Sequence, residues 1–92
     1  MPSYTIVEFT PKNKEMMQMY SAKAAQTIAE YQGEFLIKSP VKVLNGETNY
    51  EYAAIIIFPS AELAEAWYNS PAYQDLVDLR NQGMESKFIL LS

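Results

Sequence analysis

The side chains best suited to binding a ligand gather in the last third of the sequence, around a Ser-Pro pair. Trp67 and Tyr68 precede Ser70-Pro71, and Tyr73 follows it. Aromatic side chains around a break between two helices can line a pocket. The alternative is that Trp67 and Tyr73 are anchors of the hydrophobic core and that Ser70 only caps a helix.

Arg80 follows Tyr73 at helical spacing, so both residues are expected on one face of a helix. A guanidinium on a half-buried face can bind a ligand carboxylate through two parallel hydrogen bonds. The same group could instead form a structural ion pair with Glu8 or Asp78. Arg80 is therefore a candidate for ligand binding and for catalysis, with the ion pair as the alternative.

Glu8 lies in a segment expected to form a central strand, on the same face as Tyr4 and Ile6. A buried carboxylate needs a partner or a raised pKa, and with a raised pKa it can act as a general base. Alternatively, Glu8 lies at a strand end or a dimer edge, where it is solvated or paired, with Lys38 as a cross-strand partner. Glu8 joins Arg80 as a candidate catalytic residue.

Missing residue types limit the chemistry of this chain. It has no cysteine and no histidine, which excludes disulfides, thiolate catalysis and histidine-ligated heme. The acidic pairs Glu62/Glu65 and Asp75/Asp78 are typical of solvated helix faces and have no histidine neighbour. We find no phosphate-binding glycine loop and no catalytic triad. We therefore expect neither a metal site nor a cofactor.

Charge and hydropathy narrow the expected partners and the compartment. The net charge is −4, and the basic residues form no run, which is unfavourable for nucleic-acid binding. No apolar run is long enough to span a bilayer. The first four residues, Met1-Pro2-Ser3-Tyr4, lack the basic and apolar regions of a signal peptide. We expect a cytoplasmic protein with no nucleic-acid or membrane partner.

Hydrophobic periodicity and turn residues predict one domain over residues 1–92, with strands and helices in the order β-α-β-β-α-β. Asn45-Gly46 is a turn, and Ser70-Pro71 divides the second helical region. This order predicts an α+β ferredoxin-like fold, with a four-stranded antiparallel sheet and both helices on one face. The predicted strands are 4–9, 34–38, 50–58 and 87–91, and in one alternative the second strand continues over 41–44 after a bend or bulge. The predicted helices are 13–31, from 60 to the break, and from 70 to 83.

The strand over residues 50–58 predicts a dimer, because it is apolar on both faces. Ile55 and Ile57 point to one side, and Ile56 and Phe58 point to the other. Helices cover only one side, and a bare apolar sheet face is unusual in a soluble monomer. The simplest cover is the same face of a second copy, which would make a homodimer through the open sheet face. In the alternative, a twisted monomer, a C-terminal segment would cover the face, but no residues remain for it.

Two segments resemble the family of small bacterial proteins called domain of unknown function 1330. They are Phe58-Pro59-Ser60-Ala61-Glu62 and Trp67-Tyr68-Asn69-Ser70-Pro71-Ala72-Tyr73-Gln74. The resemblance covers nearly the whole chain, and it implies a dimeric α/β barrel with ligands held between helices and sheet. It carries over no catalytic residue. Glu34 follows the turn Tyr31-Gln32-Gly33 where the family commonly has a basic residue, so any anion binding by that residue is in doubt here.

Three functions are compatible with these residues. The first is a binding or sensing module for a small, aromatic or anionic molecule. The second, by analogy of fold, is a cofactor-independent monooxygenase or isomerase in which the substrate supplies the electrons. The third is a structural or assembly module without a ligand. For the first, the candidate ligand-binding residues are Tyr4, Tyr31, Trp67, Tyr68, Tyr73 and Arg80.

Overall fold

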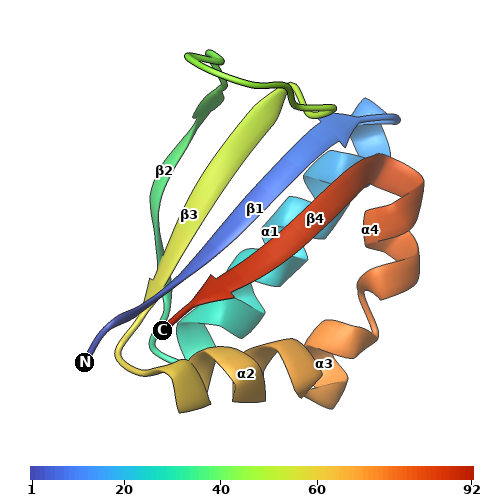
Figure 1. The fold of residues 1–92 in the computed structure, drawn as a ribbon. Helices are drawn as coiled ribbons and strands as arrows, with labels where there is room; N and C mark the ends of the chain where they lie inside the picture. Colours follow the sequence, from blue (N-terminus) through green and yellow to red (C-terminus); the bar gives the residue numbers. More distant parts are fainter.

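A computed structural model describes the whole chain, residues 1–92. The four strands form one antiparallel sheet in the order β2-β3-β1-β4, and the helices lie against one of its faces (Figure 1). This arrangement confirms the predicted α+β class and the ferredoxin-like order. None of the helices is both long enough and apolar enough to cross a membrane. The elements are β1 (Ser3–Pro11), α1 (Lys14–Glu30), β2 (Glu34–Pro40), β3 (Tyr52–Phe58), α2 (Ala61–Asn69), α3 (Pro71–Gln74), α4 (Val77–Gly83) and β4 (Met84–Leu91).

Helix α1 has a side-chain cap at its N-terminus and is followed at its C-terminus by a sterically restricted turn. The Asn13 side chain accepts a hydrogen bond from the Met16 N–H at 3.1 Å, which satisfies a free donor of the first turn. At the other end, Gln32 has a left-handed backbone with φ of 66°. Gly33 is needed for space, because a Cβ there would lie 2.5 Å from Phe58 Cε2.

Ser70 organises the break between α2 and α3. Its hydroxyl donates to the Trp67 carbonyl at 2.7 Å and accepts from the Tyr73 N–H at 3.2 Å. Pro71 occupies the start of α3, where its missing N–H costs nothing. The turn brings Tyr73 against Trp67, with ring centroids 4.4 Å apart. The single helix expected after this break is divided into α3 and α4.

Two strand predictions differ from the structure. The pairing of β2 with β3 shifts near Leu36, inside the strand, and Val41–Leu44 does not continue it. The bulge therefore falls within the predicted segment 34–38 rather than between this segment and residues 41–44. Strand β4 begins at Met84 rather than at Lys87, because Met84 pairs with Pro11 at the far end of the long strand β1.

The hydrophobic core lies between the helices and the sheet. Trp67, Tyr73 and Phe58 are its largest fully buried aromatic side chains. Burying a side chain of this size stabilises the fold by roughly 2–3 kcal/mol. Helix α2 buries Ala64 and Trp67 at helical spacing, whereas Ala66 is exposed. The other members of the core are Val7, Phe9, Tyr20, Ala24, Ile28, Ala54, Ile56 and Met84.

The sheet face turned away from the helices is apolar and uncovered in a single chain. Ile6, Ile55 and Ile57 are only half-buried there, at the centre of the sheet. Around them, four further side chains are between 37% and 55% exposed. The alternation of the strands predicts such a face. These four are Tyr4, Ile37, Ile89 and Leu91.

Candidate functional site

A cavity of about 430 Å³ lies between the edge strand β4 and the helices α2 and α4. Ser86, Phe88 and Leu90 alternate along β4 and form its floor. Trp67 and Tyr68 of α2 line it from the helix side, and Arg80 enters it from α4. Its volume is within the range of small-molecule sites. Three predicted ligand-binding residues therefore line one cavity.

Arg80 is a cation without an anionic partner. Its Nη1 donates to the hydroxyls of Tyr68 and Tyr73, both at 3.1 Å, and its Nε donates to Asn81 Oδ1 at 3.3 Å. Its Cζ lies 5.0 Å from the centroid of the Phe88 ring. The one ion pair of the chain lies elsewhere, so the expected pairing of Arg80 with Glu8 or Asp78 is wrong.

The Nη2 group of Arg80 makes no hydrogen bond within the protein. A guanidinium carries five N–H donors, so two of them remain available to a molecule in the cavity. Burial lowers the pKa of Arg80, but its hydrogen bonds to Tyr68 and Tyr73 raise it by more, and the pKa lies above its usual value. Arg80 is therefore charged at neutral pH.

Two buried tyrosines, Tyr20 and Tyr73, form a chain of hydrogen bonds that ends at Arg80. The hydroxyls of Tyr20 and Tyr73 lie 2.7 Å apart, deep between α1 and α3. Burial raises the pKa of Tyr20, and the neighbouring Tyr73 adds to the rise. Burial also raises the pKa of Tyr73, although its hydrogen bonds with Tyr20 and Arg80 lower it. Both phenols are neutral at ordinary pH, so they hold the guanidinium in place without cancelling its charge.

Trp67 belongs both to the hydrophobic core and to the lining of the cavity. Its indole Nε1 donates to Thr27 Oγ1 at 3.0 Å, which fixes the ring over the sheet beside Phe58. Trp67 also lines the cavity, although it is only 1% exposed. Tyr73, in contrast, is fully buried and does not line the cavity, so it contacts Arg80 rather than a ligand.

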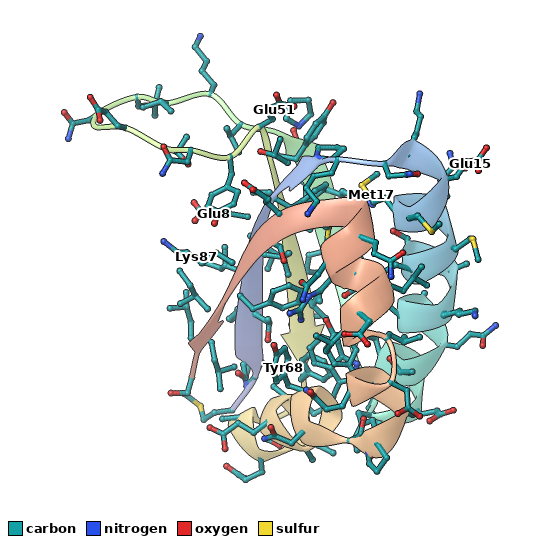
Figure 2. The ribbon with its side chains drawn as sticks, turned by 90° about the vertical axis from the view of Figure 1, so that its right-hand side faces the viewer. Glu8, Glu15, Met17, Glu51, Tyr68 and Lys87 are labelled. Atoms are coloured by element: carbon teal, nitrogen blue, oxygen red, sulfur yellow. The ribbon has the colours of Figure 1, made fainter.

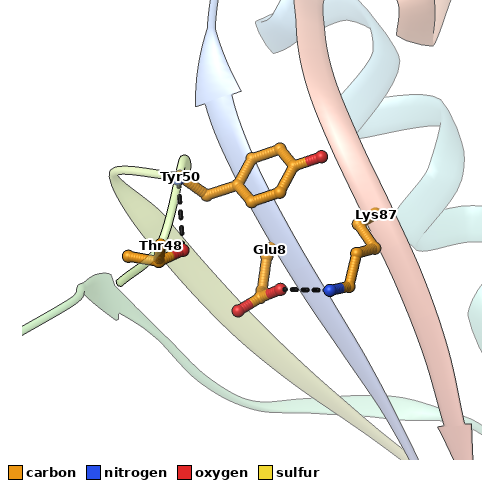
Figure 3. Close-up of polar contacts among 4 residues, drawn as sticks. All are labelled: Glu8, Thr48, Tyr50 and Lys87. Carbon is orange, nitrogen blue, oxygen red and sulfur yellow. Dashed lines mark hydrogen bonds and ion pairs between the residues drawn. The ribbon is translucent and has the colours of Figure 1, made fainter. Parts of the chain in front are cut away.

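Glu8 lies far from this cavity. Figure 2 shows Glu8 and Lys87 on the sheet face turned away from the helices, whereas Tyr68 lies on the helix side. Glu8 Oε2 lies 3.5 Å from Lys87 Nζ, its direct neighbour across β1 and β4 (Figure 3). The expected partner Lys38 is wrong, because β3 separates β2 from β1 and because Lys38 lies over the Phe9 ring on the other face.

The two remaining predicted ligand-binding residues lie outside the cavity. Tyr4 belongs to the open sheet face, and Tyr31 caps the end of α1 and packs against the core. The sequence reasoning missed Thr5, Glu65 and Ser86, which line the cavity. Strand alternation contained the signal for Thr5, because it places this hydroxyl on the helix-covered face of a central strand.

Acidic side chains do not gather anywhere in the chain. No three of the Asp and Glu residues, the only metal-ligating types present, lie close enough together to hold a metal ion.

Comparison with known proteins identifies the family. The sequence profile of the family described as Domain of unknown function (DUF1330) matches residues 2–92. The chain belongs to this family. No curated protein matches this DUF1330 chain in sequence.

Solved structures share the fold of this DUF1330 protein at low sequence identity. A protein of unknown function from Rhodopseudomonas palustris has a TM-score of 0.79 at 15% identity, covering 98% of this chain and 80% of its own. A dimeric ferredoxin-like protein of unknown function from Jannaschia sp. CCS1 has a TM-score of 0.74 at 16% identity, covering 100% and 99%. SnoaB, a cofactor-independent oxygenase from Streptomyces nogalater, has a TM-score of 0.72 at 13% identity, covering 99% and 91%. At these identities the likeness concerns the fold alone.

Proposed function

We propose that this DUF1330 protein binds a small aromatic anion in the cavity between α2, α4 and β4. The observation that carries the proposal is the Arg80 guanidinium, which lines the cavity with no carboxylate partner and two unused donors. A carboxylate that met Nη2 would gain charge-assisted hydrogen bonds in a partly desolvated site.

The aromatic residues that line the cavity favour an anion that carries an aromatic ring. Tyr68 and Phe88 are half-buried and line the cavity, an edge-to-face contact joins Tyr68 to the buried Trp67, and a tilted contact joins Tyr68 to Phe88. A ligand ring of similar size can extend the cluster by offset or edge-to-face contacts, each adding about 0.5–1.5 kcal/mol. Arg80 already lies near the Phe88 ring, so its charge faces the end of such a ligand.

Hydrocinnamate and its neutral amide, hydrocinnamamide, test this proposal by calorimetric titration. We expect hydrocinnamate to bind at least tenfold more tightly than the amide, because hydrogen bonds to a charged group contribute about 1.5–3 kcal/mol. Arg80→Gln should remove this preference, and Arg80→Lys should retain part of it. Equal affinities for acid and amide in the wild-type protein, or an unchanged preference in Arg80→Gln, would refute the proposal.

Two control variants separate the site from general charge effects. Lys23→Gln removes a cation from an exposed position of α1 and should leave both affinities unchanged. Glu8→Gln should also leave them unchanged, because Glu8 lies on the opposite face of the sheet and pairs with Lys87. Circular dichroism of each variant verifies that the fold is retained.

We further propose that the protein is a homodimer in which two open sheet faces pack together. Support comes from the apolar side chains left uncovered on that face and from the dimeric ferredoxin-like neighbour of similar fold. Ile57→Glu places a charge within the proposed interface and should yield monomers in light scattering. Met19→Glu makes the same change at an exposed position of α1 and should leave the dimer intact. A wild-type monomer at micromolar concentration would contradict the proposal.

A cofactor-independent enzyme is the second candidate function. Glu65 lines the same cavity as Arg80, so a carboxylate and an uncompensated cation face one bound molecule. The carboxylate can accept a proton from a C–H group next to a carbonyl, while the guanidinium stabilises the negative charge on the oxygen of the resulting enolate. Solvent deuterium exchange into bound hydrocinnamate or related acids, lost in Glu65→Gln, is the expected sign. Exchange that is absent or unaffected by Glu65→Gln counts against this function.

A further inference from the structure

Thr5 is the one buried polar side chain that makes no hydrogen bond within the protein. Four polar side chains are buried, and three of them have partners: Ser3 donates to the Leu91 carbonyl, Thr27 to the Ala24 carbonyl and Ser70 to the Trp67 carbonyl. Thr5 is only 5% exposed and has no such partner. A buried hydroxyl left unpaired destabilises a fold, so this one needs an explanation.

The Thr5 hydroxyl opens into the cavity. Every fully enclosed side-chain oxygen and nitrogen in the chain has a hydrogen-bond partner. The Thr5 oxygen, which has none, is therefore not fully enclosed, and Thr5 lines the cavity described above. This hydroxyl is both a donor and an acceptor with its full capacity unused.

Thr5 of β1 and Arg80 of α4 line the cavity next to different residues of β4. Thr5 pairs with Leu90, so it is a diagonal neighbour of Phe88, roughly 7–8 Å away between Cα atoms. Arg80 lies over the Phe88 ring, 5.0 Å from its centroid. The direct neighbour of Thr5 across the two strands is the apolar Leu90, and Arg80 is the only cation that lines the cavity. The cavity therefore offers a cationic contact over Phe88 and a neutral hydroxyl opposite Leu90, two residues further along β4.

We infer that the ligand carries a hydroxyl on the end of its ring remote from the acid group, and that Thr5 binds this hydroxyl. The inference rests on the proposed function and names the ligand class more closely, as a phenolic acid. A second negative charge at the Thr5 end would have no counter-ion, because Arg80 is the only cation of the lining, and a desolvated unpaired charge is unfavourable. A neutral hydroxyl there can donate to or accept from Thr5 Oγ1 and satisfy both groups.

Para-hydroxyhydrocinnamate and hydrocinnamate, which differ only in this hydroxyl, test the inference by calorimetric titration. We expect the phenolic acid to bind about fivefold more tightly to the wild-type protein, the net contribution of one neutral hydrogen bond. Thr5→Val has nearly the same shape without the hydroxyl, so it should abolish this difference while hydrocinnamate affinity stays the same. Thr5→Ser retains the hydroxyl and should retain the difference.

Ser86→Ala provides the matched control within the same cavity. Ser86 is four residues before Leu90, the partner of Thr5, which places it roughly 13 Å further along β4. Removing this hydroxyl should not change the preference for the phenolic acid. If hydrocinnamate binds as proposed and the phenolic acid binds no better, or if Thr5→Val keeps the preference, only the inference about Thr5 falls. If neither acid binds, the proposed function falls, and the inference falls with it.

Discussion

The Tyr73 hydroxyl has two partners, and removing it tests how Arg80 is held. Tyr73 is 0% exposed, and its oxygen lies 2.7 Å from the Tyr20 hydroxyl and 3.1 Å from Arg80 Nη1. The Tyr20 hydroxyl, in a side chain only 6% exposed, has no other partner. The Tyr73→Phe variant therefore leaves a buried donor unsatisfied and also removes one acceptor from a charged group.

The expected loss of stability follows from these two effects. An unsatisfied buried hydroxyl costs about 1–3 kcal/mol, and the lost acceptor of Arg80 adds to this, so we expect Tyr73→Phe to lower the free energy of unfolding by about 2–3 kcal/mol. Tyr20→Phe leaves the Tyr73 O–H without an acceptor but keeps the hydrogen bond from Arg80 to Tyr73, so it should cost less, about 1–2 kcal/mol. In a domain of this size, the Tyr73→Phe loss corresponds to a decrease in Tm of roughly 10–20 °C.

The double variant Tyr20→Phe/Tyr73→Phe decides whether the hydroxyls are coupled. With both removed, no buried hydroxyl is left unpaired and only the lost acceptor of Arg80 remains, so the double variant should be at least as stable as Tyr73→Phe alone. Urea unfolding followed by circular dichroism gives the three free energies, at one protein concentration because dimerisation would add to stability. Losses that add to within about 0.5 kcal/mol would refute the coupling.

Three further predictions concern pH and packing. Because burial raises the pKa of Tyr20 and Tyr73, their contribution to stability is complete below the usual tyrosine pKa of about 10 and is lost as the pH rises above it. Ultraviolet titration should then show two of the seven tyrosines ionising only as the chain unfolds. Gly83→Ala would place a Cβ 2.7 Å from the Met17 backbone nitrogen and should cost about 1–3 kcal/mol, measured by urea unfolding. Gly33→Ala would meet the buried Phe58 ring at 2.5 Å and should cost a similar amount in the same assay.

Local patterns were enough to predict the order of the elements, because each depends on residues close in sequence. Alternation identified the strands, the period of α1 identified a helix, and Ser70-Pro71 marked a break. Spacing also placed Arg80 on the same face as Tyr73, and the two side chains are hydrogen-bonded. The third member, Tyr68, belongs to α2, and only the turn at Ser70 brings it to Arg80.

The partner of Glu8 shows where strand patterns alone were insufficient. Lys38 and Lys87 both lie in strands and carry the right charge, so composition does not distinguish them. The order of the sheet does, because β4 is adjacent to β1 and β2 is not. The ferredoxin-like topology already implies this order, so the Lys38 pairing could have been rejected once the fold had been predicted.

Ser3 and Thr5 show why a binding residue is harder to predict than a core residue. They lie two positions apart on β1, with similar side chains and similar burial, and alternation places both on the helix-covered face. Ser3 reaches the Leu91 carbonyl near the end of the neighbouring strand, and its hydroxyl is satisfied by the fold itself. Above Thr5 the helices leave a cavity, so its hydroxyl meets open space rather than a carbonyl. The difference between a structural hydroxyl and one free to bind a ligand therefore depends on how α2 and α4 pack over the strand, which no pattern within β1 contains.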